Sequence, residues 1–139
     1  MLECLILGDS IAVGTHQVRT ECVAYAKGGI NSWQWNKTHG SKDLAAKTVI
    51  ISLGSNDHRY IKTRYELERI RDRITADRVY WILPHGNLKA SGVAIEDIQQ
   101  IVEDIANRHK DWIIRIPYVS KDGIHPTGKG YRKIGEITK

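Results

Sequence analysis

The sequence predicts a three-layer α/β/α sandwich built on a five-stranded parallel sheet. Two observations lead to this prediction: short apolar runs alternate with segments of helical spacing, and turn residues close each run. Alternation of strands and helices is typical of a parallel sheet with helices on both faces. No repeat or linker interrupts the pattern, so we expect one domain over residues 1–139.

The five predicted strands are rich in apolar and β-branched residues, and each ends at a Gly, a Pro or a polar turn. They cover residues 2–7, 22–26, 48–53, 79–83 and 112–116. Nearly continuous apolar runs are typical of strands that are buried on both faces.

Helical spacing is clearest in residues 64–76 and 93–108. In the second segment, Ile98, Val102 and Ile105 belong to an apolar stripe that suits a helix lying on a sheet. The first segment mixes arginines with acidic residues. We interpret it as a solvated helix face and not as a nucleic-acid stripe, because no nucleic-acid motif accompanies it.

Composition sets limits on the function classes. The chain has 139 residues, 21 Lys and Arg against 16 Asp and Glu, and a net charge of +5. This length suits a single core. No apolar run approaches the roughly 20 residues that span a bilayer, so we expect no membrane partner and, given the spread of the charge, no nucleic acid. The oligomeric state is not readable from the sequence.

The two cysteines, Cys4 and Cys22, are too few for a disulfide framework and lack closely spaced metal-binding neighbours. We predict two free, buried thiols in a reducing compartment. The N-terminus has no basic leader before its first strand, which predicts no signal peptide and a cytoplasmic location. We expect neither a metal nor a cofactor.

The polar residues with chemical potential follow the predicted strands. These loops are 8–10, 28–32, 54–57, 84–87 and 122–125. Sites in parallel α/β sheets lie beyond the carboxyl ends of the strands, so the five loops are expected to meet at one edge. Ser10 alone could be a helix N-cap, and Asn56 and Asp57 could be Asx turns. Their joint occurrence favours a catalytic site.

Asp122 and His125 lie three residues apart around Gly123. One turn at this spacing can bring the carboxylate to Nδ1 of the imidazole, which leaves Nε2 free to take a proton from a serine. Of the six histidines, only His125 has an acid at this spacing in a loop after a strand. We therefore predict a catalytic triad of Ser10, His125 and Asp122.

Four blocks of this sequence resemble, in order and strand context, those of the SGNH (GDSL-type) hydrolase superfamily. They are Gly8-Asp9-Ser10, the glycine loop at 28–29, Gly54-Ser55-Asn56-Asp57 and Asp122-Gly123-Ile124-His125-Pro126. The resemblance spans residues 8–126 and implies a flavodoxin-like sheet of order 2-1-3-4-5. The compact length is similar to members carried by bacteriophages, which would place the protein in a virion or the host cytoplasm.

The resemblance also implies an activity, serine ester hydrolysis, and roles for single residues. Ser10 is the expected nucleophile, and its N–H, the Gly29 N–H and the Asn56 amide are the expected oxyanion hole. Gly28 is the alternative to Gly29. Asp9 and Asp57 are expected to brace loops by accepting backbone N–H bonds.

The substrate is expected to be a small molecule or glycan that carries a short acyl or O-acetyl ester, because a chain this short has little material for an acyl tunnel. The residues that follow the site loops are candidate substrate contacts: Trp33, Trp35, Arg59, Tyr60, His85 and Asn87. Core packing is the more common role of a tryptophan. Lysophospholipase and thioesterase activities use the same constellation.

Other readings fit the residues less well. Residues 123–129 match a P-loop spacing, but Gly130 stands where a hydroxyl should bind Mg²⁺, and the match comes at the end of the chain. The G-x-S-x-G elbow and the H-E-x-x-H motif do not occur. A non-catalytic glycan-binding module on the same fold is the main alternative, although it would not need to keep Ser10 and His125.

Overall fold

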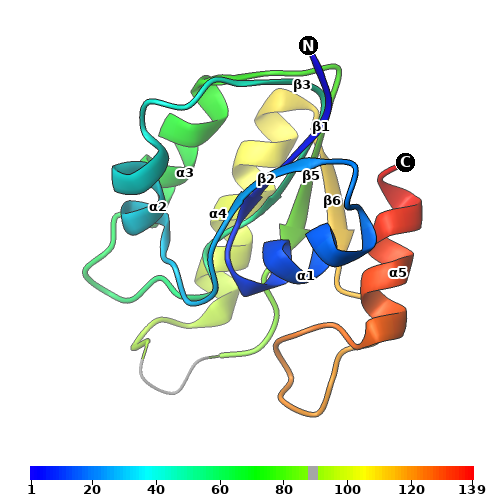
Figure 1. Ribbon diagram of the computed structural model, residues 1–139. Coiled ribbons are helices and arrows are strands. Elements are labelled where there is room, and N and C mark those ends of the chain that lie inside the picture. The colour runs from blue at the N-terminus through cyan, green and yellow to red at the C-terminus, as the bar shows by residue number, and fades with distance from the viewer. Residues whose placement is uncertain (88–90) are drawn as a thin grey trace.

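A parallel sheet forms the middle layer of the computed structural model, which describes residues 1–87 and 91–139 (Figure 1). Its strands pair in the order β2-β1-β3-β5-β6 and every pairing is parallel. They are β1 (Leu2–Gly8), β2 (Val23–Ala26), β3 (Leu44–Ser52), β5 (Arg78–Leu83) and β6 (Trp112–Arg115). The five predicted strands are confirmed in the expected order, and one short strand, β4 (Ile74–Thr75), also pairs with β3.

Helices cover both faces of the sheet (Figure 1). One face carries α1 (Ser10–Val18) and α5 (Gly128–Ile137), and the other carries α2 (Ser32–His39), α3 (Thr63–Asp72) and α4 (Ile95–His109). Side chains alternate along each strand, so neighbouring apolar residues enter different cores. Leu5 and Leu7 of β1 pack towards α2, α3 and α4, whereas Ile6 packs with α1 and α5. In the described residues, no helix has the length and apolar character needed to cross a membrane.

The helix expected over residues 64–76 ends earlier, at Asp72. The N–H of Arg73 bonds to the carbonyl of Ile70, and the chain then enters β4, where Ile74 pairs with Leu44. Ile70 and Ile74 are both buried in the same core. The apolar spacing therefore continues past the helix end, which explains why periodicity placed the boundary too late.

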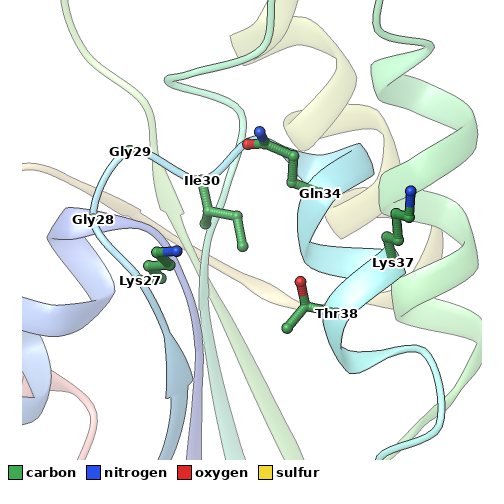
Figure 2. A pocket seen from close by; sticks show the side chains of 7 residues that line it. All are labelled: Lys27, Gly28, Gly29, Ile30, Gln34, Lys37 and Thr38. Atoms are coloured by element: carbon green, nitrogen blue, oxygen red, sulfur yellow. The ribbon is translucent and has the colours of Figure 1, made fainter.

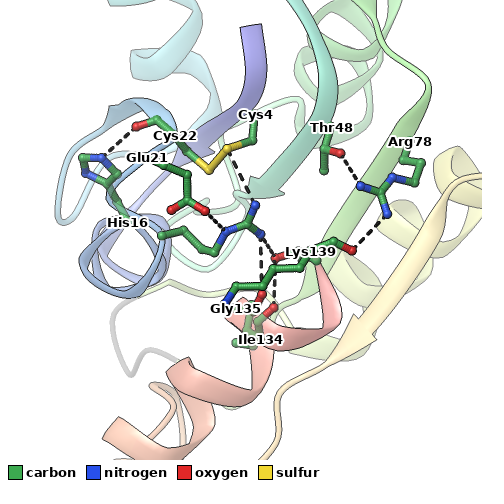
Figure 3. Close-up of polar contacts among 11 residues, drawn as sticks. Cys4, His16, Glu21, Cys22, Thr48, Arg78, Ile134, Gly135 and Lys139 are labelled. Carbon is green, nitrogen blue, oxygen red and sulfur yellow. Dashed lines mark hydrogen bonds and ion pairs between the residues drawn. A yellow bond between two sulfur atoms is a disulfide. The ribbon is translucent and has the colours of Figure 1, made fainter.

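The prediction of free thiols is wrong, because Cys4 and Cys22 form a disulfide with their Cα atoms 4.8 Å apart (Figure 3). The register of β1 and β2 pairs Leu5 with Val23. The residues just before this pair, Cys4 and Cys22, therefore lie side by side. This neighbourhood depends on strand order and register, which cysteine spacing does not reveal. Disulfides persist in oxidising compartments, so the basis for placing the chain in a reducing one is removed.

Candidate active site

Ser10 lies at the carboxyl edge of the sheet, where β1 turns directly into α1. Gly8 makes this turn possible: its φ is +144°, and a Cβ there would lie 1.8 Å from the carbonyl oxygen of Ser52 on β3. Asp9 is the N-cap of α1, and its Oδ1 accepts a hydrogen bond from the N–H of Ile11 at 3.0 Å. The serine is thus the first helical residue, and Gly8 and Asp9 fix the backbone that precedes it.

Asp122 and His125 lie on a tight turn between β6 and α5. Oδ1 of Asp122 accepts bonds from the N–H of Ile124 at 2.8 Å, the N–H of His125 at 2.9 Å and the hydroxyl of Ser120 at 2.8 Å. Oδ2 is left for Nδ1 of His125, at 2.5 Å. The backbone N–H of His125, with the His125 ring and the other donors, holds the pKa of Asp122 well below its usual range.

The structure brings Ser10, His125 and Asp122 into one hydrogen-bonded chain. Nε2 of His125 lies 2.8 Å from Oγ of Ser10. An ionised carboxylate can only accept hydrogen bonds, so Nδ1 of His125 carries the ring proton. Nε2 of His125 then accepts the hydrogen bond from the serine hydroxyl. The side chains of His125 and Asp122 are 37% and 47% exposed, so the site opens to solvent.

The three predicted oxyanion donors lie around the loop that follows β2. A Cβ on Gly28 would lie 3.9 Å from Cβ of Ser10, and Gly29 has a φ of +79° that favours glycine. Nδ2 of Asn56 donates to the carbonyl of Ile30 in the same loop at 3.0 Å. Gly28 is therefore next to the serine, and Gly29 makes the bend.

Asp57 connects two helices behind the site. It is buried and accepts the N–H of Ser32 at 2.8 Å, the hydroxyl of Ser32 at 2.5 Å and the hydroxyl of Thr63 at 2.8 Å. It thereby joins the first residues of α2 and α3 to the Asn56 loop. Burial raises the pKa of Asp57, and these hydrogen bonds oppose the rise. The predicted bracing by Asp57 agrees with these contacts.

Asp9 is the second predicted bracing residue. Its Oδ1 accepts the hydroxyl of Ser52 at 3.0 Å as well as the Ile11 N–H. The carboxyl group is fully buried, and burial raises the pKa of Asp9 to about 6.

The predicted substrate contacts are only partly placed where substrate could reach them. Trp33 is 48% exposed, and Arg59 lies against the exposed ring of Tyr60. Trp35 is wrong as a candidate contact: it is completely buried and its indole N–H donates to the carbonyl of Tyr25 at 2.9 Å.

The loop after β5 supplies two contacts that sequence reasoning did not assign. Nδ1 of His85 lies 2.7 Å from the carbonyl oxygen of Gly123, inside the Asp122–His125 turn. Oδ1 of Asn87 accepts the N–H of Ile95 at 2.7 Å and so satisfies the first turn of α4. His85, predicted to contact substrate, therefore touches the Asp122–His125 turn. No sequence signal links residues so far apart along the chain.

A pocket of about 430 Å³ adjoins the glycine loop (Figure 2). It lies between this loop and α2. Its lining residues are Lys27, Gly28, Gly29, Ile30, Gln34, Lys37 and Thr38.

The sequence matches no protein-family model and no curated protein. The structure resembles a lipase/acylhydrolase from Enterococcus faecalis with a TM-score of 0.71 and 17% identity, over 99% of this chain and 93% of that one. The chain has the fold of the GDSL lipases.

Two further structures agree with this assignment of the fold. A GDSL-like lipase from Bacteroides thetaiotaomicron gives a TM-score of 0.69 and 20% identity, over 97% of this chain and 84% of that one. A member of the lipolytic protein G-D-S-L family from Veillonella parvula gives a TM-score of 0.66 and 14% identity, over 98% of this chain and 95% of that one. The GDSL fold therefore extends over nearly the whole chain.

Proposed function

We propose that this chain is a serine ester hydrolase in which Ser10 is the nucleophile, His125 the general base and Asp122 the group that orients the base. The observation that carries the proposal is the hydrogen-bonded chain from Oγ of Ser10 through His125 to Asp122, with distances of 2.8 and 2.5 Å. The GDSL fold agrees with it, since the similar structures include lipases and an acylhydrolase.

In the proposed mechanism, Oγ of Ser10 attacks the ester carbonyl while Nε2 of His125 takes the serine proton. The imidazolium that forms is stabilised by Asp122, whose low pKa keeps it ionised. His125 then gives the proton to the leaving alcohol as the C–O bond breaks. Water, activated by the same histidine, hydrolyses the acyl-enzyme and restores Ser10.

Charge on the carbonyl oxygen would be stabilised by the N–H of Ser10, the N–H of Gly29 or Gly28, and the side chain of Asn56. One N–H of the Asn56 amide is used on Ile30, which fixes the group and leaves a second N–H to donate. Removal of one such donor typically lowers kcat about 10²–10³-fold.

We further propose that the substrate carries a short acyl group, such as an O-acetyl group on a sugar. The neighbouring pocket supports this, because Lys27, Gln34, Lys37 and Thr38 bring hydrogen-bonding groups to it that suit sugar hydroxyls. The exposed Trp33, at the start of α2, could stack on a sugar ring.

The test is turnover of p-nitrophenyl esters of increasing acyl length and of acetylated sugars. We expect hydrolysis that is fastest for acetyl esters and is lost in Ser10→Ala. Turnover by the wild type that equals that of Ser10→Ala and His125→Ala would refute the proposal and favour a binding module.

A further inference from the structure

The pocket beside the glycine loop is lined by both apolar and polar groups, and its charged groups are basic. Lys27 and Lys37 contribute two ammonium groups, and Gln34 and Thr38 contribute an amide and a hydroxyl (Figure 2). No carboxylate is among its lining residues, all of which lie in the part of the chain that the structure describes. A substrate group that enters this pocket therefore meets positive charge without an internal counter-charge.

The pocket adjoins the proposed nucleophile through the glycine loop. Gly28 lines the pocket, and the position of a Cβ on Gly28 is 3.9 Å from Cβ of Ser10. Ser10 is not itself among the lining residues, so a substrate whose ester carbonyl lies at Ser10 would reach the pocket with a substituent that extends past the glycine loop.

Three of the four polar side chains of the pocket lie on α2. Asn31 caps this helix, and Oε1 of Gln34 accepts the Asn31 N–H at 3.0 Å, which leaves the Gln34 NH₂ available as a donor. Nζ of Lys37 lies 5.0 Å from the ring centre of Trp33. Gln34, Lys37 and Thr38 are spaced so that they share one face of the helix. Lys27 lies opposite them, at the end of β2 (Figure 2).

We propose that this pocket is an anion subsite and that the substrate is an acyl ester that also carries a carboxylate or another anionic group. Lys27 and Lys37 bind the charge, and Gln34 and Thr38 donate hydrogen bonds to it. The inference rests on the proposed ester hydrolysis and adds its substrate class. The net charge of +5 would increase the encounter rate with an anionic substrate.

The experiment compares two matched pairs of esters. In the first pair the charge lies on the alcohol side: an O-acetylated uronic acid against its methyl ester. In the second it lies on the acyl side: p-nitrophenyl hemisuccinate against p-nitrophenyl butyrate. The measured quantity is the ratio of kcat/KM for the anionic ester to that for the neutral ester. The pair with the higher ratio tells which side of the ester enters the pocket.

We expect this ratio to exceed one in at least one pair and to fall as ionic strength rises. Each of Lys27→Gln and Lys37→Gln should lower it about three- to five-fold, a size typical of exposed charge pairs. Lys129→Gln is the matched control: it removes the same charge from the start of α5, outside the pocket, and should leave the ratio nearly unchanged.

Two results would overturn the inference: turnover with no anionic preference in either pair, or an equal loss of preference in Lys129→Gln, which would indicate general electrostatic steering. Failure of the wild type to hydrolyse any of the four esters would instead refute the proposed function.

Discussion

At the scale of single residues, the turn around Ser10 contains a buried carboxyl group. Asp9 is fully buried, and its Oδ2 has no hydrogen-bond partner among the described residues, although Oδ1 has two. Burial disfavours the charged form more than these hydrogen bonds favour it, which is why the pKa is raised to about 6. The sequence could predict that Asp9 braces the loop, because an acid before a helix is a common cap. It could not predict the burial, which depends on β3 lying alongside.

Asp9 should make stability depend on pH. The native pKa of about 6 lies above the ordinary 3.8, so the folded state holds this proton more tightly than the unfolded chain does. Its contribution is therefore full below about pH 3.8 and is lost as the pH rises through 6. The loss amounts to about 3 kcal/mol, at 1.36 kcal/mol per pKa unit.

The measurement is urea unfolding of the wild type and Asp9→Asn near pH 4 and near pH 7.5. Because Asn cannot ionise, the free energy of unfolding of Asp9→Asn relative to the wild type should rise by about 2–3 kcal/mol between these two pH values. A difference that does not change with pH would show that Asp9 is not a buried acid with a raised pKa.

At the scale of elements, the Asp122–His125 turn depends on neighbouring loops for its position. Its two functional side chains are more than a third exposed, and the turn joins the protein body partly through His85, whose Nδ1 lies 2.7 Å from the Gly123 carbonyl. The approach is close: a Cβ on Gly86 would lie 2.2 Å from the same carbonyl oxygen. The loop after β5 is thus a support for the Asp122–His125 turn.

Replacement of His85 should separate this supporting role from a substrate contact. In Asn, Nδ2 occupies the place of Nδ1 of His and can still donate to Gly123, whereas the amide of Gln lies one bond further out. We therefore expect His85→Asn to stay within about two-fold of the wild-type kcat, and His85→Gln and His85→Ala to lose about ten-fold, because small errors in the position of a catalytic group are costly.

KM should change little in all three variants. A rise in KM with kcat preserved, equal in His85→Asn and His85→Gln, would indicate instead that His85 touches the substrate, as the sequence suggested.

The predictability of the elements follows from how local their signals are. The inner strands β1, β3 and β5 are largely buried and appear as apolar runs, and the Asp122–His125 spacing is contained within one turn. The short strand β4 has only two residues, Ile74 and Thr75, and exists because it pairs with β3. Its position depends on tertiary pairing, so the sequence pattern could not reveal it.

At the scale of the whole molecule, strand order brings distant residues together at both ends of the sheet. At the carboxyl ends it joins Ser10 to His125, which are 115 residues apart. Near the amino ends it joins Cys4 to Cys22 (Figure 3). The first meeting was predictable because parallel sheets gather their loops at one edge. The second required the register of β1 and β2, which the sequence does not contain.

The disulfide should stabilise the whole fold. It closes a loop with a sequence separation of 18, and loops near this length contribute about 3 kcal/mol by restricting the unfolded chain. Cys4→Ala/Cys22→Ala should therefore unfold at lower urea concentration than the oxidised wild type, with a free energy of unfolding lower by about 3 kcal/mol. A reductant should shift the wild type and leave the double variant unchanged. Two thiols titrated in the denatured, unreduced protein would contradict the pairing.

The most direct test of the central claim, that Ser10 is a nucleophile activated by His125, is covalent labelling with a fluorophosphonate followed by mass spectrometry of the peptides. The account predicts one adduct, on Ser10, with no labelling of Ser10→Ala and much slower labelling of His125→Ala, which keeps the serine but lacks the base. An adduct on Ser32 or Ser55, or labelling that persists at the wild-type rate in Ser10→Ala, would contradict it.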